Sequence, residues 1–293
     1  MQRIAIDHLT EYRYSNPIQL QEHRLMLRPR EGHDVRVASS ELLLEPLAKV
    51  KWNRDAYDNS VAILQFEGKC ERLSIRTKTV IEHYEESPLD FVVAEYALHF
   101  PFNYNPAERT GLVPFLLPIY TEDSPSIQSW TSQFWQPGQL METFVLVDTM
   151  SRAIYDHFQY QMREAPGVQP PGETLAKKSG SCRDFATLLM EACRYLGMAA
   201  RFVSGYLHCP ATERGRGATH AWTEVYLPGT GWKGFDPTTA QVVGSDHIAV
   251  AVERHPEAAP PVAGSFIGNL SAPPVMEVDV QVRGVSDSEV ENG

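Results

Sequence analysis

Three residues of the chain have side chains and positions suited to covalent catalysis. Cys182 follows Gly180 and Ser181 and directly precedes a run with helical periodicity, so it is expected at the start of a helix. The N-terminal end of a helix stabilises negative charge, and its N–H groups can donate to an oxyanion. Cys182 is therefore the candidate nucleophile, although most cysteines that precede helices do no chemistry.

A cysteine nucleophile needs a base, and the base needs a group that orients it. His220 opens the predicted strand "HAWTEVYL", with Trp222 on the same face. The turn "PGTG" that follows predicts a hairpin, which brings Asp236 of the next strand toward the His220 end. Taken singly, these are a strand-end histidine and an aspartate before a proline. Together, Cys182, His220 and Asp236 predict a thiol triad.

The run after Cys182 predicts an amphipathic helix with one face in a core. Apolar residues recur at helical spacing from Phe185 to Leu196, and Gly197 can end the helix. Cys193 lies in this apolar stripe and is interpreted as a core residue. Cys70 falls at a predicted turn, and Cys209 is the fourth cysteine. The cysteines form no CxxC pair and no zinc-ligand spacing, so neither a metal nor a disulfide framework is expected.

The elements around these residues predict an α+β fold. Residues 1–92 read as short antiparallel strands of a sandwich-like domain, with one turn expected at Asn16-Pro17. Residues 93–293 are assigned to a catalytic domain, with its motif core at about 140–255 and C-terminal strands to about 285. That part is expected to begin with a loop-rich segment to about 125. Helices over 124–135 and 140–160 and a polar loop before Cys182 follow.

Composition excludes several classes of protein. The net charge of −11 argues against nucleic-acid binding, and the longest nearly apolar run, 111–120, is too short to span a bilayer. No secretory signal is recognised at the N-terminus, so a reduced, cytoplasmic protein is expected. The pair Asp246 and His247 is interpreted as structural, because neighbouring strand residues point to opposite faces.

The motifs "GSCRDFATLLMEACRYLG", "THAWTEVYLPGTGWKGFDPTTA" and "DHIAVAVER" resemble bacterial transglutaminase-like proteins of the papain-like thiol enzyme class. The start of the chain is similar to the N-terminal β domain of such proteins. The resemblance implies a papain-like core in which a Cys-bearing helix packs on an antiparallel sheet. It also implies Cys182 as nucleophile, His220 as general acid/base and Asp236 as orienter. It implies a peptide or protein substrate and no cofactor.

Several functions remain open from the sequence. Hydrolysis of a peptide or isopeptide bond is favoured over glutamine-to-amine transfer. Cross-linking relatives use a tryptophan as oxyanion donor, and neither Trp130 nor Trp135 is clearly placed for that; Tyr160 is a possible substitute. A scaffold protein that keeps the fold without catalysis is a further alternative. A zinc hydrolase using Cys182 with His208 or His220 is the remotest one.

Overall fold

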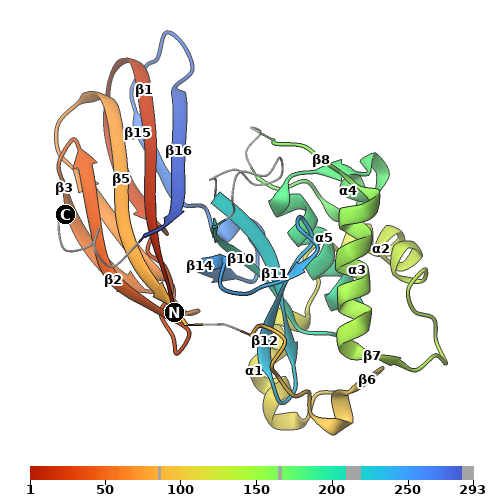
Figure 1. Ribbon diagram of the computed structural model, residues 1–293. Coiled ribbons are helices and arrows are strands. Elements are labelled where there is room, and N and C mark those ends of the chain that lie inside the picture. The colour runs from red at the N-terminus through yellow and green to blue at the C-terminus, as the bar shows by residue number, and fades with distance from the viewer. Residues whose placement is uncertain (85–86, 164–166, 209–218, 286–293) are drawn as a thin grey trace.

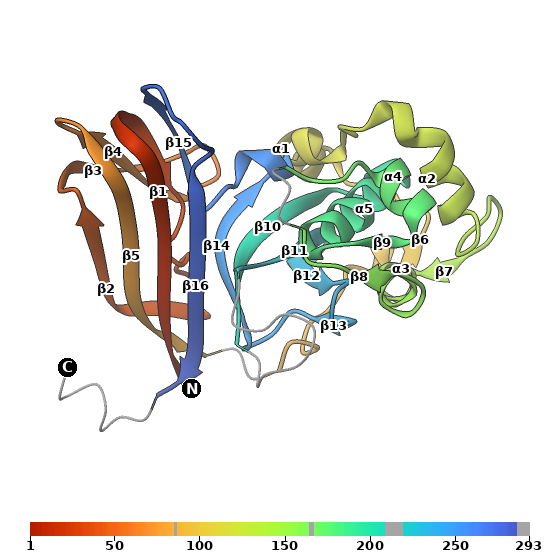
Figure 2. The ribbon, with the colours of Figure 1, turned by 90° about the horizontal axis from the view of Figure 1, so that it is seen from above.

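The structure is a computed structural model that describes residues 1–84, 87–163, 167–208 and 219–285. A β domain formed by both ends of the chain lies beside a mixed α/β domain (Figure 1). Helices α2 to α5 of the second domain lie on the side of its sheet away from the β domain (Figure 2). The α+β class expected from the sequence is confirmed.

The β domain consists of two antiparallel layers that share one long strand. The first half of β1 lies between β5 and β16, and its second half lies between β4 and β15. Strands β2 and β3 pair with β5 and β4, respectively, on the outer sides. These strands are β1 (Gln2–Leu25), β2 (Val35–Glu45), β3 (Ala48–Arg54), β4 (Ser60–Phe66), β5 (Cys70–His83), β15 (Val262–Ile267) and β16 (Val275–Gly284).

The turn expected at Asn16-Pro17 is wrong, because β1 continues through both residues. The register between β1 and β5 instead shifts between Arg13 and Ile18. Pro17 has no N–H to give to a ladder, so an irregularity suits it. The shift lets one strand serve both layers, with Ile18, Leu20 and their apolar neighbours buried between them.

The C-terminal strands lie in a different sheet from the one expected. The sequence assigned them to the catalytic domain, but β15 and β16 both pair with β1 of the N-terminal sheet. Alternating strand patterns give the face that each strand buries but not its partner, so this long-range pairing was not readable from the sequence.

The second domain is built on a five-stranded antiparallel sheet in the order β13-β12-β11-β10-β14. Helix α5 packs against β10 and β11. The strands are β10 (Ala200–Leu207), β11 (Thr219–Leu227), β12 (Gly231–Asp236), β13 (Gln241–Val242) and β14 (His247–Glu253). The helices are α1 (Pro106–Leu116), α2 (Ser124–Thr131), α3 (Thr143–His157), α4 (Pro171–Lys177) and α5 (Cys182–Tyr195). Short elements complete the domain: η1 (Glu95–Ala97), β6 (His99–Phe100), η2 (Thr121–Asp123), β7 (Met141–Glu142), β8 (Gln159–Tyr160), β9 (Ser179–Gly180) and η3 (Pro256–Ala258).

Two helices lie where the sequence predicted loops. Helix α1 falls in the segment expected to be loop-rich, and it begins with Pro106 after a capping box between Asn105 and Glu108. Helix α4 interrupts the polar loop before Cys182 and begins at Pro171. In both cases proline occupies the first helical position, where its missing N–H costs nothing. Helix α2 also ends at Thr131, earlier than the predicted residue 135.

The β domain covers one edge of the five-stranded sheet. Strand β14 is the edge strand, and its residue Val252 exchanges two hydrogen bonds of 2.9 Å with the Asn59 side chain. The backbone N–H of Arg30 donates to Ala249 of the same strand at 2.8 Å. Backbone groups that would otherwise be unpaired at this edge are therefore satisfied across the domain interface.

Candidate active site

Cys182 is the first residue of α5, at the position that the periodicity predicted. Ser181 precedes the helix, and both its backbone N–H and its hydroxyl donate to Asp184 Oδ2 at 2.8 Å. Asp184 Oδ1 accepts from Arg163 Nη1 and from the backbone N–H of Gln169, each at 2.7 Å. The buried Asp184 carboxylate thus ties the helix start to the preceding loop and fixes the Cys182 backbone.

Gly180 gives this turn the space it needs. A Cβ atom at this position would lie 2.9 Å from Asp184 Cβ and 3.3 Å from the Phe185 ring. Any larger residue would therefore push against the residues that start the helix.

Helix α5 is buried on more than its apolar face, beyond what the sequence indicated. Every residue from Asp184 to Arg194 is buried. The polar pair of Glu191 and Arg194 forms an ion pair of 2.9 Å, and Glu191 also accepts from the backbone N–H of Ile119 and Tyr120. Because these charges are paired and hydrogen-bonded, the helix can lie at the centre of the domain.

The hairpin places Asp236 beside His220. Strands β11 and β12 pair with Leu227 opposite Gly231 and Thr223 opposite Phe235, so Asp236 lies at the His220 end. His220 Nε2 lies 2.7 Å from Asp236 Oδ2, and both residues are buried. An ionised carboxylate only accepts, so His220 carries its hydrogen on Nε2 and leaves Nδ1 for Cys182.

The charges of this site support one another. Burial opposes the imidazolium form of His220, but the negative charge and hydrogen bond of Asp236, together with Cys182, raise the pKa of His220 to about 10. Burial also opposes the Asp236 carboxylate, yet His220 and His247 outweigh this and lower the pKa of Asp236. The arrangement favours a protonated His220 imidazole beside the ionised Asp236 carboxylate.

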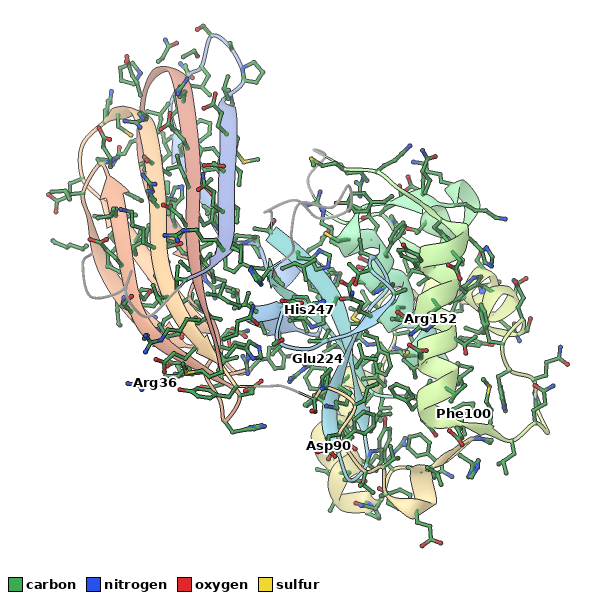
Figure 3. All side chains as sticks on the ribbon, in the orientation of Figure 1. Arg36, Asp90, Phe100, Arg152, Glu224 and His247 are labelled. Carbon is green, nitrogen blue, oxygen red and sulfur yellow. The ribbon has the colours of Figure 1, made fainter. Side chains whose placement is uncertain are left out.

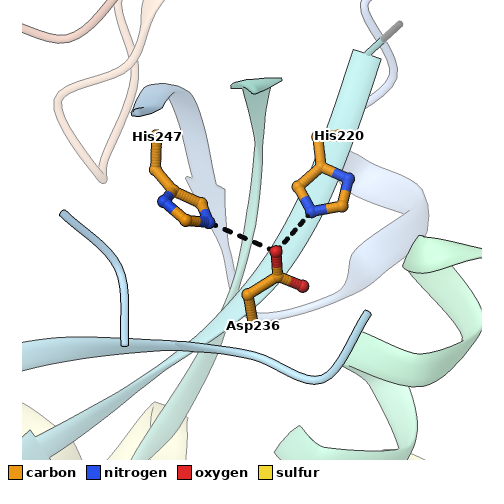
Figure 4. A group of neighbouring side chains, drawn as sticks. All are labelled: His220, Asp236 and His247. Atoms are coloured by element: carbon orange, nitrogen blue, oxygen red, sulfur yellow. Dashed lines mark hydrogen bonds and ion pairs between the residues drawn. The ribbon is translucent and has the colours of Figure 1, made fainter. Parts of the chain in front are cut away.

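A second histidine that the sequence analysis set aside lies on the same carboxylate. His247 Nε2 is 3.2 Å from Asp236 Oδ2, on the side opposite His220 (Figure 4). Asp246 points elsewhere and contacts His208 Nδ1 at 3.1 Å. The neighbouring pair indeed does not act together, as predicted. Its histidine nevertheless belongs to the site, through a contact between β14 and β12 that strand alternation could not reveal.

The cluster of His220, Asp236 and His247 also has the dimensions of a metal site, with one ligand atom of each within 4.8 Å of the others. Its internal contacts fit hydrogen bonding better. Both histidines direct Nε2 at the same carboxylate oxygen, at 2.7 and 3.2 Å, so a cation would have to displace two N–H groups that are already paired.

A cavity of about 530 Å³ opens at Cys182 and His220. Val168, Phe202 and Ala221 form apolar walls, and Arg183 and Glu257 bring charges of opposite sign. One wall is the segment from Pro256 to Pro261, which connects β14 to β15. The Pro261 carbonyl accepts from Met26 of the β domain at 3.0 Å, so the β domain anchors this wall. A larger cavity, of about 730 Å³, lies beside Trp130 and Phe134, and its lining does not include Cys182, His220 or Asp236.

Comparison with other proteins places the chain in a family. Residues 4–82 match the bacterial transglutaminase-like N-terminal region, and residues 139–237 match the transglutaminase-like superfamily. The chain is 30% identical over 295 residues to the uncharacterized protein Rv2569c of Mycobacterium tuberculosis strain H37Rv. The alignment covers 96% of this chain and 92% of that protein. This chain belongs to the bacterial transglutaminase-like family. The uncharacterized protein Mb2599c of Mycobacterium bovis is similar to the same extent.

The fold of this transglutaminase-like chain is also found in a crystal structure. A candidate cysteine protease from Cytophaga hutchinsonii superposes with a TM-score of 0.75 at 18% identity, over 97% of this chain and 91% of that chain. Nearly the whole two-domain arrangement is therefore shared. The superfamily match, 139–237, contains Cys182, His220 and Asp236 and ends before His247.

The possible oxyanion donors of this transglutaminase-like chain are placed as follows. Trp130 is buried against Phe134, and Trp135 Nε1 donates to the Gln139 carbonyl at 2.9 Å, so both are engaged in packing or local bonding.

Tyr160 lies in β8, opposite Gly180 of β9. Burial, with the negative charges of Cys182 and Asp236, raises the pKa of Tyr160 to about 12. Its hydroxyl therefore keeps a proton that it can donate.

Cys70, Cys182 and Cys193 are free thiols, and Cys209 lies outside the described residues. Within the described parts of the chain, no helix combines the length and apolar character needed to cross a bilayer.

Proposed function

We propose that this chain catalyses acyl transfer on amide bonds, with Cys182 as nucleophile, His220 as general acid and base, and Asp236 as orienter. The observation that carries the proposal is the 2.7 Å contact of His220 with Asp236, together with Cys182 and His220 lining one cavity. The favoured reaction is hydrolysis of a peptide or isopeptide bond in a peptide or protein. The net charge of −11 disfavours a nucleic-acid substrate.

The mechanism follows from the two nitrogens of His220. Nδ1 takes the Cys182 proton, and the thiolate attacks the amide carbonyl carbon to form a C–S bond. The imidazolium then gives its proton to the departing amine as the C–N bond breaks. The neutral imidazole then takes a proton from water, and the hydroxide attacks the thioester carbonyl carbon. The C–S bond breaks, the Cys182 sulfur takes the proton back from the imidazolium, and the acid product loses its proton to solvent and leaves as a carboxylate. Asp236 stays ionised throughout and keeps the Nε2–H tautomer. These steps need no metal or organic cofactor.

Glutamine-to-amine transfer is the second candidate, since the chain belongs to a transglutaminase-like family. Transfer passes through the same Cys182 thioester as hydrolysis and differs only in the nucleophile that attacks the thioester, an amine instead of water. Hydrolysis is preferred because neither Trp130 nor Trp135 is free to serve as the indole donor of cross-linking relatives. A cytoplasmic location is retained as part of the proposal, because a thiol nucleophile must stay reduced. Fractionating cells that express the tagged chain would test the location.

The experiment uses p-nitrophenyl acetate as acyl donor. The proposal predicts a burst of nitrophenolate and an acetyl group on Cys182, found by peptide mass spectrometry in wild type and absent from Cys182→Ala. Adding a primary amine then separates the two candidates: unchanged turnover to acetate supports hydrolysis, whereas an amide product supports transfer. A folded wild type without acetyl-Cys182 would contradict both and leave a non-catalytic scaffold.

A further inference from the structure

Asp236 is held by more donors than orienting His220 requires. Its Oδ1 accepts from the Thr238 backbone N–H at 2.8 Å, and its Oδ2 accepts from the Thr239 hydroxyl at 2.7 Å. The same Oδ2 also receives His220 Nε2 and His247 Nε2. A carboxylate oxygen has about two lone-pair directions, so three donors compete for this one atom.

His247 is fixed in the orientation that makes this contact. Its backbone N–H donates to Gly244, closing a turn at the start of β14, and its ring Nδ1 lies 3.5 Å from the Gly244 N–H. The His247 and Trp222 rings pack edge to face, with their centroids 5.3 Å apart and their planes at 78°. With Nδ1 facing a donor and Nε2 facing an acceptor, the hydrogen of His247 lies on Nε2. His247 also lines a polar cavity of about 280 Å³ whose lining comes from both domains, and Figure 3 labels this histidine on the part of the second domain that faces the β domain.

Building on the function proposed above, we infer that His247 is a positioning residue that weakens the hold of Asp236 on the His220 proton. His220 must both receive a proton and release it in each cycle, and a buried carboxylate with His220 as its main partner would hold the imidazolium too firmly. The N–H of His247 spreads the negative charge of Oδ2 and keeps Asp236 ionised while His220 is neutral.

The consequence is clearest in the acyl-enzyme, where Cys182 carries no charge and His220 must be neutral to activate water. The ionisable groups facing this histidine and its carboxylate are Cys182 of α5, Tyr160 of β8, Asp236 of β12 and His247 of β14. Removing the His247 donor leaves Asp236 as a stronger partner for the imidazolium. Deacylation then requires a higher pH.

The test is the pH profile of steady-state p-nitrophenyl acetate turnover, which reports deacylation once the burst is complete. His247→Leu is expected to move the midpoint of the profile upward by about one pH unit, which lowers the rate about tenfold below the midpoint. Thr239→Val removes another donor from the same oxygen and is expected to shift the midpoint in the same direction. His247→Gln keeps an N–H near this position and is expected to restore the wild-type midpoint.

The outcomes separate this inference from the proposed function. A wild type without acetyl-Cys182 would defeat the proposed function itself. A wild-type burst with superimposable profiles for wild type and His247→Leu would overturn the inference alone. So would a His247→Leu protein that loses thermal stability and rate without any shift of midpoint, or a shift that His247→Gln fails to reverse, because a packing residue would behave in that way.

Discussion

At the scale of single residues, the site depends on a few contacts between groups that are far apart in the chain. His220, Asp236 and His247 come from three strands, Cys182 comes from helix α5, and Tyr160 comes from the short strand β8, which pairs with β9 just before that helix. Turn spacing predicted that Asp236 lies beside His220, and apolar periodicity predicted Cys182 at the start of a helix; the structure has both placements, and the catalytic roles stay predictions. His247 was missed because its contact with Asp236 depends on how β14 and the end of β12 are placed, and strand periodicity does not determine that.

Tyr160→Phe tests the oxyanion donor. We expect acetylation of Cys182 by p-nitrophenyl acetate to slow by about tenfold or more, because the developing oxyanion loses one donor. Alkylation by iodoacetamide forms no oxyanion, so its rate at Cys182 should stay at the wild-type value and serves as the control. Equal acetylation rates in Tyr160→Phe and wild type would remove Tyr160 from the site.

At the scale of elements, the helix carrying Cys182 and the strands β11 and β12 were predicted because their signals are local. Apolar spacing, Gly197 and the "PGTG" turn each lie within the element that they define. Helices α1 and α4 were not predicted, because both are short and lie in proline-containing segments that are typical of loops. Pro106 and Pro171 instead open helices, and the capping box at Asn105 and Glu108 was the signal that could have revealed α1.

Asp184→Asn tests the anchoring of α5. One carboxylate oxygen becomes an amide group that faces donors, and Arg163 loses its partner. We expect the free energy of unfolding to fall by about 3 kcal/mol, measured by urea denaturation. The matched control is Asp148→Asn, which breaks the exposed i,i+4 pair with Arg152 in α3 and should cost less than about 1 kcal/mol. Similar losses for both variants would show that Asp184 does not anchor the helix start.

At the scale of the whole molecule, the two domains depend on each other. Both chain ends build the β domain, its residues cover the β14 edge, and the β14–β15 connection forms a wall of the Cys182 cavity. His8 of β1 lies buried at this interface, where its Nδ1 contacts the Tyr206 hydroxyl of β10 at 2.8 Å. These contacts join residues that are far apart in the chain, so local sequence patterns do not reveal them.

His8 makes the stability of the assembly depend on pH. Burial, which outweighs the nearby Asp7 and Asp279, lowers the pKa of His8 from 6.5 to about 4. As the pH falls, His8 therefore becomes protonated in the unfolded chain at a higher pH than in the folded protein. The stabilisation is complete above about pH 6.5 and is lost as the pH falls toward 4.

The variant His8→Gln isolates this contribution from groups of opposite sign, such as Glu253, whose pKa burial raises to about 7. Between pH 7.5 and 5, we expect wild type to lose about 2 kcal/mol more free energy of unfolding than His8→Gln. Urea denaturation at the two pH values measures the difference. Parallel losses in the two proteins would show that His8 is not the group responsible.

The central claim is that His220 activates Cys182, and iodoacetamide labelling of Cys182 against pH tests it most directly. Cys70, a half-buried thiol in the same sample, is the internal reference. Because the pKa of His220 is raised to about 10, its imidazolium should pair with the thiolate, and wild-type labelling should change less than about threefold between pH 8.5 and 6. In His220→Ala it should fall about a hundredfold over the same range, as for an ordinary thiol. A wild type that follows the steep curve of the mutant would contradict the claim.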